Sequence, residues 1–182
     1  MHYCDYTATL PPDNPHRRYH DHEYGYPIAE DDRLFERLVF EINQAGLSWT
    51  TILNKAENLR RAYDHFAIAR VAAYGEADIV RLLADTGIIR NRRKIAAAIH
   101  NARVIHELQA AHGSFRAWLD AQTGVDKAVW VKLFKKTFAF TGPEITGEFL
   151  MSSGYLEGAH RRDCPVYAQI LAAHPRWLTG GG

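Results

Sequence analysis

Cysteine and methionine are scarce in this 182-residue chain, which has two of each. Two cysteines cannot build the dense disulfide framework of small secreted domains, so that class of fold is excluded. Long hydrophobic runs are also absent, and none approaches the roughly 20 residues of a membrane-spanning helix. The N-terminus has no basic segment followed by an apolar stretch. We therefore expect no signal peptide, no membrane partner and a cytoplasmic protein.

Neither sign of charge is in excess, because the formal net charge is only +1 at pH 7. This balance alone does not predict a nucleic-acid-binding protein. A hydrophobic content of 47% favours a folded protein, with one domain over residues 1–182. Basic residues nevertheless cluster, and the clusters either share one phosphate-binding face or lie at solvated helix ends. They are Arg17–Arg18, Arg60–Arg61, Arg90–Lys94, Lys135–Lys136 and Arg161–Arg162.

Alternating strand patterns are absent as well, and nearly every periodic segment has helical spacing. Helices are predicted over residues 76–85, 91–111, 126–136 and 143–154, where glycine and proline mark several of the ends. Ser114 is expected to be the N-cap of a further short helix. The sequence therefore predicts an all-α fold with less regular terminal segments.

A carboxylate in an apolar stripe is the most informative feature that is present. Glu41 is expected on the core side of a helix whose apolar residues are Leu34, Leu38 and Ile42. Burial of a carboxylate is costly unless a polar group or a ligand satisfies it. Trp49 follows as a flat aromatic surface, which together with Glu41 suits a pocket for a planar, hydrogen-bonding molecule. The alternative is a core glutamate bonded to a backbone amide.

Residues 137–143 lie between two predicted helices and contain Gly142 and Pro143. Such a hairpin exposes free backbone amides at a helix N-terminus, where a phosphate group can bind. A helix pair joined by a glycine-containing turn is also a common packing element. The hairpin by itself leaves both interpretations open.

The two cysteines, Cys4 and Cys164, lie near opposite ends of the chain, and each has histidines at usable range. His160 and Cys164 would share one face if their segment were helical. Two cysteines and two histidines make a ligand set typical of a closed structural zinc site. The alternatives are a Cys4–Cys164 disulfide or two unconnected thiols. Three residues compete for the remaining position: His16, His20 and His22.

The chain resembles the 3-methyladenine DNA glycosylase I family of the helix-hairpin-helix superfamily. The resemblance rests on Cys4, residues 19–25, residues 41–49, residues 87–95, and the pair His160 and Cys164. It implies a helix-hairpin-helix glycosylase-like domain with a helical body over residues 31–154 and a hairpin near 137–143. Terminal segments 1–30 and 155–182 would be tied together by one structural zinc ion per chain. A monomer is expected.

Site residues follow from the resemblance by position. The zinc ligands would be Cys4, His20, His160 and Cys164. Glu41 would be the catalytic, base-binding carboxylate, ionised and accepting hydrogen bonds from the excised base. The remaining base-binding residues would be Tyr6, Tyr19, Tyr24 and Trp49, although family members usually have tryptophan in place of Tyr6 and Tyr24. DNA-binding residues would be Arg90, Lys94, Lys136, Thr141 and Gly142.

The implied function is base-excision repair of alkylated double-stranded DNA. After base flipping, the enzyme would hydrolyse the N-glycosidic bond of 3-methyladenine without a lysine nucleophile. The superfamily generally has a catalytic aspartate after the hairpin, and Ala159 cannot serve in that role. Two alternatives are a catalytically silent DNA-binding module of the same fold and a helical protein that binds a small molecule.

Overall fold

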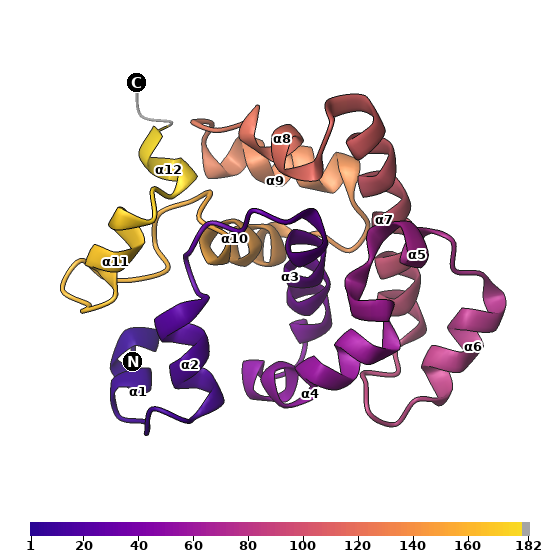
Figure 1. Ribbon diagram of the computed structural model, residues 1–182, viewed down its shortest axis with the longest axis horizontal. Coiled ribbons are helices and arrows are strands. Elements are labelled where there is room, and N and C mark those ends of the chain that lie inside the picture. The colour runs from indigo at the N-terminus through magenta and orange to yellow at the C-terminus, as the bar shows by residue number, and fades with distance from the viewer. Residues whose placement is uncertain (180–182) are drawn as a thin grey trace.

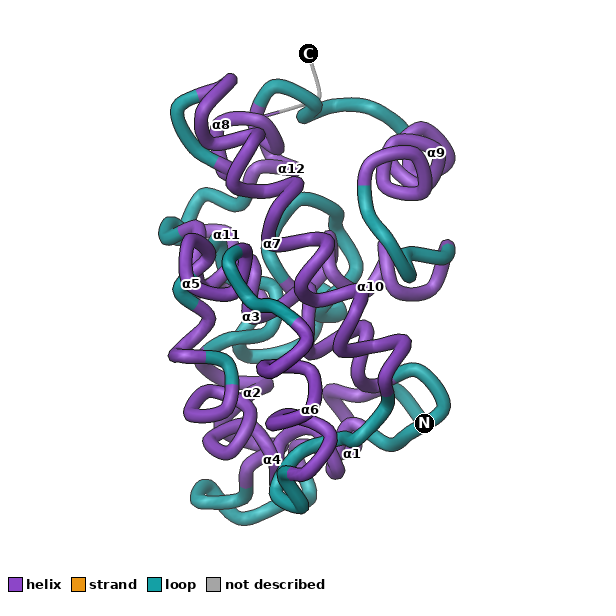
Figure 2. The backbone as a smooth tube through the Cα atoms, turned by 90° about the vertical axis from the view of Figure 1, so that its right-hand side faces the viewer, coloured by secondary structure: helices purple, strands orange, loops and turns teal. Residues whose placement is uncertain are grey.

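Helices and loops form the whole of the computed structural model over residues 1–179, which are the residues that the structure describes (Figures 1 and 2). No strand occurs within that range, which confirms the predicted all-α fold. None of these helices combines the length and apolar character needed to cross a bilayer. The elements are α1 (Tyr3–Ala8), α2 (Pro15–His22), α3 (Asp31–Gln44), α4 (Trp49–Ala62), the 3-10 turn η1 (Asp64–Phe66), α5 (Ile68–Ala72), α6 (Glu76–Ala84), α7 (Arg92–His112), α8 (Phe115–Asp120), α9 (Lys127–Thr137), α10 (Pro143–Ser152), α11 (Tyr167–Ala172) and α12 (Arg176–Thr179).

Local capping signals explain why the predicted helices form where they do. The predicted ranges 76–85, 91–111, 126–136 and 143–154 correspond to α6, α7, α9 and α10. The Asn91 side chain accepts from the Lys94 amide at the start of α7, and Gly113 ends that helix with φ +87°. Ser114 caps α8 as expected, by accepting from the Ala117 amide. Helix α4 was outside the predicted ranges.

Helix α3 lies at the centre of the molecule, between α10 and α4 in Figure 1. Every residue from 34 to 43 is buried, so α3 is covered on all sides rather than along one stripe. Three of the polar residues among them, Glu36, Arg37 and Asn43, have hydrogen-bond partners inside the protein. Glu36, for example, accepts from Arg60 Nη2 at 2.8 Å. Because α3 is packed on all sides, Glu41 is held in the interior of the protein.

The two ends of the chain meet on one side of the molecule, where α1 and α2 lie near α11 (Figure 1). A small apolar cluster separate from the main core is formed there by Cys4, Cys164, Val166 and Ile170. Arg161 adds a two-pronged ion pair to Asp5, with N–O distances of 2.7 and 2.9 Å. The division of the chain at residues 30 and 155 stays a prediction.

Candidate active site and metal centre

A cavity of about 680 Å³ opens where the N-terminal segment, the end of α3, the start of α4 and the start of α10 meet. Its lining is mostly apolar and aromatic, with three carboxylates and one amide side chain, which is typical of a site for a planar ligand. The lining residues are Tyr3, Tyr19, Tyr24, Glu41, Gln44, Ala45, Gly46, Leu47, Trp49, Gly142, Pro143, Glu144, Ile145 and Glu148.

Glu41 reaches this cavity from α3 and is 4% exposed. Within residues 1–179 no hydrogen bond to its carboxyl group is formed, so the alternative of a backbone amide partner does not hold. Burial raises the pKa of Glu41 to about 8, although Arg37 opposes the shift; Glu148 adds to it. At pH 7 this pKa favours the protonated form of Glu41 in the free protein, and the expected ionised form with a bound base stays a prediction.

Aromatic rings form one wall of the cavity. Tyr19 lies against Trp49 with a centroid distance of 5.1 Å and against Tyr24 at 5.5 Å. Arg37 holds Tyr19 in place, because its Nη1 donates a hydrogen bond to the Tyr19 hydroxyl at 3.0 Å. The indole Nε1 of Trp49 is buried and has no hydrogen-bond partner in the described structure. Three of the four predicted aromatic residues thus come together around Glu41.

Tyr6, the fourth predicted aromatic residue, lies outside the cavity and is 38% exposed. Its ring stacks on Tyr3 and meets the edge of His16, with centroid distances of 6.3 and 5.4 Å. Tyr3, three residues earlier on α1, takes the place in the wall. Residues three apart lie on neighbouring faces of one helix, so the linear sequence could not decide which ring faces the pocket.

Glu148, on α10, is a pocket residue that sequence reasoning missed. Its carboxylate accepts from the Tyr24 hydroxyl at 3.4 Å. Burial raises the pKa of Glu148, against the lowering effects of that hydrogen bond and of Lys127. A glutamate beside Phe149 and Leu150, on a helix directly after the hairpin, was the available signal.

The hairpin between α9 and α10 borders the same cavity, since Gly142 and Pro143 line it. Buried Asn101 of α7 holds the hairpin, donating to Ala139 O at 3.0 Å and accepting from Ala139 N at 2.7 Å. The Thr141 hydroxyl is buried and donates to the carbonyls of Phe134 and Phe138. The expected DNA contact of Thr141 stays a prediction, and it would use the backbone of the hairpin rather than this hydroxyl.

Gly142 is exposed and caps α10 with φ −77°, an extended conformation open to any residue. A Cβ added there would meet no atom within 4 Å. The positive φ of the hairpin belongs instead to Phe140, at +62°. Neither the backbone conformation nor the internal packing therefore requires glycine at position 142. The absence of a side chain there leaves the first amides of α10 accessible from outside.

The predicted basic residues divide into exposed and buried ones. Arg90 and Lys136 are exposed, and Arg93 lies 5.9 Å from the Phe140 ring centroid, close to the hairpin. Lys94, in contrast, is 5% exposed, and its Nζ donates to Asn43 O at 2.8 Å and Ala45 O at 2.6 Å. This burial contradicts the expected phosphate contact: Lys94 instead closes the C-terminal end of α3 beside the pocket.

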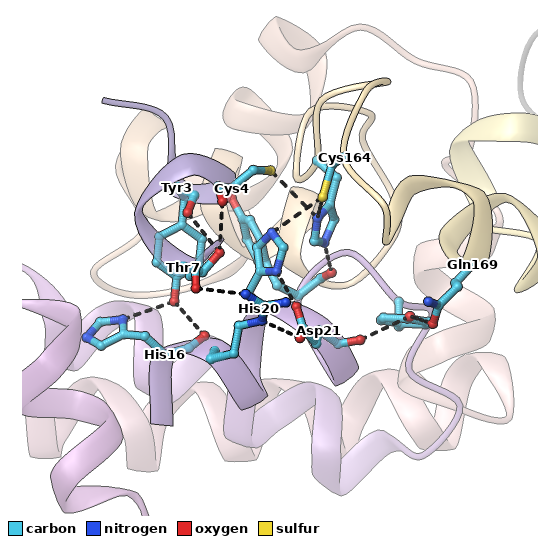
Figure 3. Close-up of polar contacts among 12 residues, drawn as sticks. Tyr3, Cys4, Thr7, His16, His20, Asp21, Cys164 and Gln169 are labelled. Carbon is cyan, nitrogen blue, oxygen red and sulfur yellow. Dashed lines mark hydrogen bonds and ion pairs between the residues drawn. The ribbon is translucent and has the colours of Figure 1, made fainter. Parts of the chain in front are cut away.

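The terminal cysteines and histidines converge, with all four ligand atoms within 4.8 Å of one another (Figure 3). The Cys164 Sγ lies 3.6 Å from His160 Nδ1 and 3.7 Å from His20 Nε2, and the Cys4 Sγ lies 3.9 Å from His160 Nδ1. Nitrogen and sulfur ligands of a tetrahedral zinc ion are separated by about 3.5 Å. Both thiols are free. The segment between His160 and Cys164 is an irregular turn rather than a helix, so the two side chains converge without sharing a helix face.

Outer contacts set the tautomers of both histidines. His160 Nε2 lies 2.7 Å from Tyr24 O and must donate a hydrogen bond to it. The His160 Nδ1 is then unprotonated, and its lone pair faces the sulfurs. The His20 Nδ1 lies 2.7 Å from Asp21 Oδ1, which leaves Nε2 free in the same way. His16 instead bonds Thr50 and Tyr3, and His22 is exposed. The buried group Cys4, His20, His160 and Cys164 could thus hold a metal ion.

Comparisons with known proteins agree with this arrangement. The methyladenine glycosylase family profile matches residues 10–167. DNA-3-methyladenine glycosylase 1 of Escherichia coli K12 is 36% identical over 168 residues, covering 82% of this chain and 89% of that protein. DNA-3-methyladenine glycosylase of Haemophilus influenzae Rd is 31% identical over 166 residues, with 81% and 89% covered.

Solved structures share the fold as well. A 3-methyladenine DNA glycosylase I from Staphylococcus aureus superposes with a TM-score of 0.78 at 30% identity, covering 91% of this chain and 97% of that one. A crystal structure of another 3-methyladenine DNA glycosylase I gives 0.75 at 34% identity, with 86% and 96% covered. The chain belongs to the methyladenine glycosylase family.

Proposed function

We propose that this chain is a monofunctional DNA glycosylase, which releases 3-methyladenine from alkylated double-stranded DNA in base-excision repair. The observation that carries the proposal is a buried carboxyl group without a protein partner, Glu41, inside an aromatic cavity. That cavity opens beside a hairpin with accessible backbone amides. The names of the relatives and the family match point to the same reaction.

The charge of the substrate supports this choice of base. Adenine methylated at N3 within DNA is a cation, and its ring would favour the π faces of Tyr19, Tyr24 and Trp49. Entry of the cation favours the ionised form of Glu41, which then accepts hydrogen bonds from the base. Glu41 is thus a recognition group whose proton is released when the base arrives.

The DNA backbone would lie along the hairpin. Phosphates accept hydrogen bonds from backbone amides at a helix N-terminus, and exposed Gly142 allows a close approach to α10. Arg90 and Lys136 would add salt-sensitive attraction. No lysine is among the residues of the described chain that line the cavity, which supports hydrolysis by water over a lysine nucleophile.

We further infer that the metal is one structural zinc ion. Four protein ligands of the N₂S₂ type fill a tetrahedral shell and leave no position for water, so the ion would brace the fold rather than take part in the reaction. Because all four ligands come from one chain, we propose a monomer. Two free thiols suit a reducing compartment, which supports the cytoplasm as the site of action.

The test is release of free bases from methylated duplex DNA by the wild type and Glu41→Gln. We expect the wild type to release 3-methyladenine and the variant, which cannot ionise, to be slower by at least about tenfold. Wild-type protein that binds DNA and zinc but releases no base would instead support a catalytically silent DNA-binding module. A variant as active as the wild type would remove Glu41 from the mechanism.

A further inference from the structure

The cavity contains a second inward carboxylate that recognition of the base does not use. Glu148 lies on α10, and in the described chain it forms no ion pair within 4 Å. Its one hydrogen bond, from the Tyr24 hydroxyl, engages Oε2 at 3.4 Å and leaves Oε1 free. A half-buried carboxylate with a free oxygen in a cavity is chemically available.

The position of Glu148 follows from the two ends of the bound nucleotide. Glu41 marks the end of the cavity where the base would lie, and the hairpin around Gly142 marks the end for the phosphate. Glu148 comes six residues after Gly142 on α10, which is about 9 Å along the helix axis. The sugar joins base to phosphate and would therefore lie between those two ends, in the cavity that Glu148 of α10 lines.

Hydrolysis at a glycosidic carbon passes through an oxocarbenium-like state, for which carboxylates are the usual protein partners. A cationic base is already a good leaving group, so no acid is needed at the base. What the reaction still needs is an acceptor for the proton of the attacking water. Glu148 is a carboxylate placed for that role.

We propose that Glu148 is a second catalytic carboxylate, which stabilises the developing positive charge on the sugar and takes the proton of the attacking water. The bond between the anomeric carbon and N9 breaks, and its electron pair passes to the base, which leaves as neutral 3-methyladenine. The water oxygen bonds to the anomeric carbon and gives one proton to Glu148, which later releases it to solvent. This inference rests on the proposed function.

The experiment measures single-turnover release of 3-methyladenine from duplex DNA by the wild type, Glu148→Gln and Glu148→Asp. Loss of a general base is worth about 100-fold or more, so Glu148→Gln is expected to be slower by that factor and Glu148→Asp to be intermediate. Affinities for free 3-methyladenine and for DNA with a tetrahydrofuran abasic analogue are measured beside the rate. Both are expected to stay within about twofold of wild type.

Glu107 provides a charge-matched control. It lies on α7, is exposed and does not line the cavity. Glu107→Gln removes the same charge from the protein, and its rate is expected to change by no more than about threefold, because solvent screens an exposed charge. An equal loss in both variants would mean that overall charge, not a placed carboxylate, is responsible, and would overturn the proposal.

Rescue by an added carboxylate distinguishes the loss of a catalytic group from a folding defect. Glu148→Ala that still binds free 3-methyladenine is folded, and formate is expected to restore part of its rate. A Glu148→Gln variant with wild-type rate, or one that loses only base affinity, would overturn the catalytic role while the proposed function stands. Wild-type protein that releases no base would overturn both.

Discussion

The Glu41 carboxyl group is buried where ionisation costs free energy, and this cost raises its pKa. In the unfolded chain it ionises near its ordinary pKa of 4.5, whereas burial raises the folded-state pKa to about 8. Between these values the folded state binds more protons than the unfolded state. Stability therefore falls as the pH rises through this window.

Glutamine at position 41 does not titrate, so Glu41→Gln should lack this loss. We expect the variant to be more stable than the wild type by at least about 1 kcal/mol at pH 8.5, with a smaller difference at pH 5. Urea unfolding at both pH values measures it. Glu107→Gln, which changes an exposed carboxylate, is the control and should show no such trend. A difference independent of pH would contradict the buried titration.

The aromatic wall gives a second prediction for single residues. Trp49→Ala removes a ring from the cavity, and loss of stacking worth about 1–3 kcal/mol should weaken binding of free 3-methyladenine by roughly fivefold to 150-fold. Tyr6→Ala should leave this affinity within about twofold, because Tyr6 lies outside the cavity. Titration calorimetry compares the two variants. Equal losses would return Tyr6 to the base-binding set.

At the scale of elements, the candidate site depends on how helix ends are held. Lys94 of α7 binds the last carbonyls around the end of α3, and Asn101 of the same helix holds the hairpin through Ala139. Helix α7 thus positions both the loop at the base end of the cavity and the hairpin at the phosphate end. Helix periodicity predicted α7 but not these contacts, since side-chain partners 38 to 51 residues away leave no local pattern.

Lys94→Gln and Arg90→Gln should separate a structural cation from a DNA-binding one. Lys94→Gln leaves buried carbonyls poorly satisfied, and we expect it to lose about 1–3 kcal/mol of folding free energy. Arg90→Gln should change stability by less than about 0.5 kcal/mol. In DNA binding, the slope of log affinity against log salt should fall by about 0.9 for Arg90→Gln and stay unchanged for Lys94→Gln. A reduced slope for Lys94→Gln would restore its predicted phosphate contact.

At the scale of the whole molecule, a metal ion held by Cys4, His20, His160 and Cys164 would join residues 4 and 164 and so close almost the entire chain into one loop. Closure restricts the unfolded chain and fixes the terminal segments against the body. The same segments carry Tyr3, Tyr19 and Tyr24 of the cavity wall. Loss of the ion should therefore affect both stability and base binding, although no ligand faces the cavity.

Metal analysis of purified protein is expected to find one zinc ion per chain. Removal by a chelator should lower the melting temperature by at least about 4 °C, since each kcal/mol shifts a domain of this size by roughly 2–4 °C. Affinity for free 3-methyladenine should fall with it and return when zinc is restored. Cys164→Ser should reproduce the loss, whereas His22→Asn, at an exposed histidine, should not. Protein without metal would reject the zinc assignment.

The sequence by itself determined several helices, among them α7 and α8, because the spacing of apolar residues and caps such as Asn91 and Ser114 act within a few residues. It did not predict α4. It also placed Glu41 inside the core, since one helix face is set by a local period. Only tertiary structure decided which residues meet across the fold: Tyr3 in place of Tyr6, Lys94 on carbonyls of α3, and Glu148 in the cavity. Those choices depend on how distant helices pack, and packing is a property of the whole chain rather than of any segment.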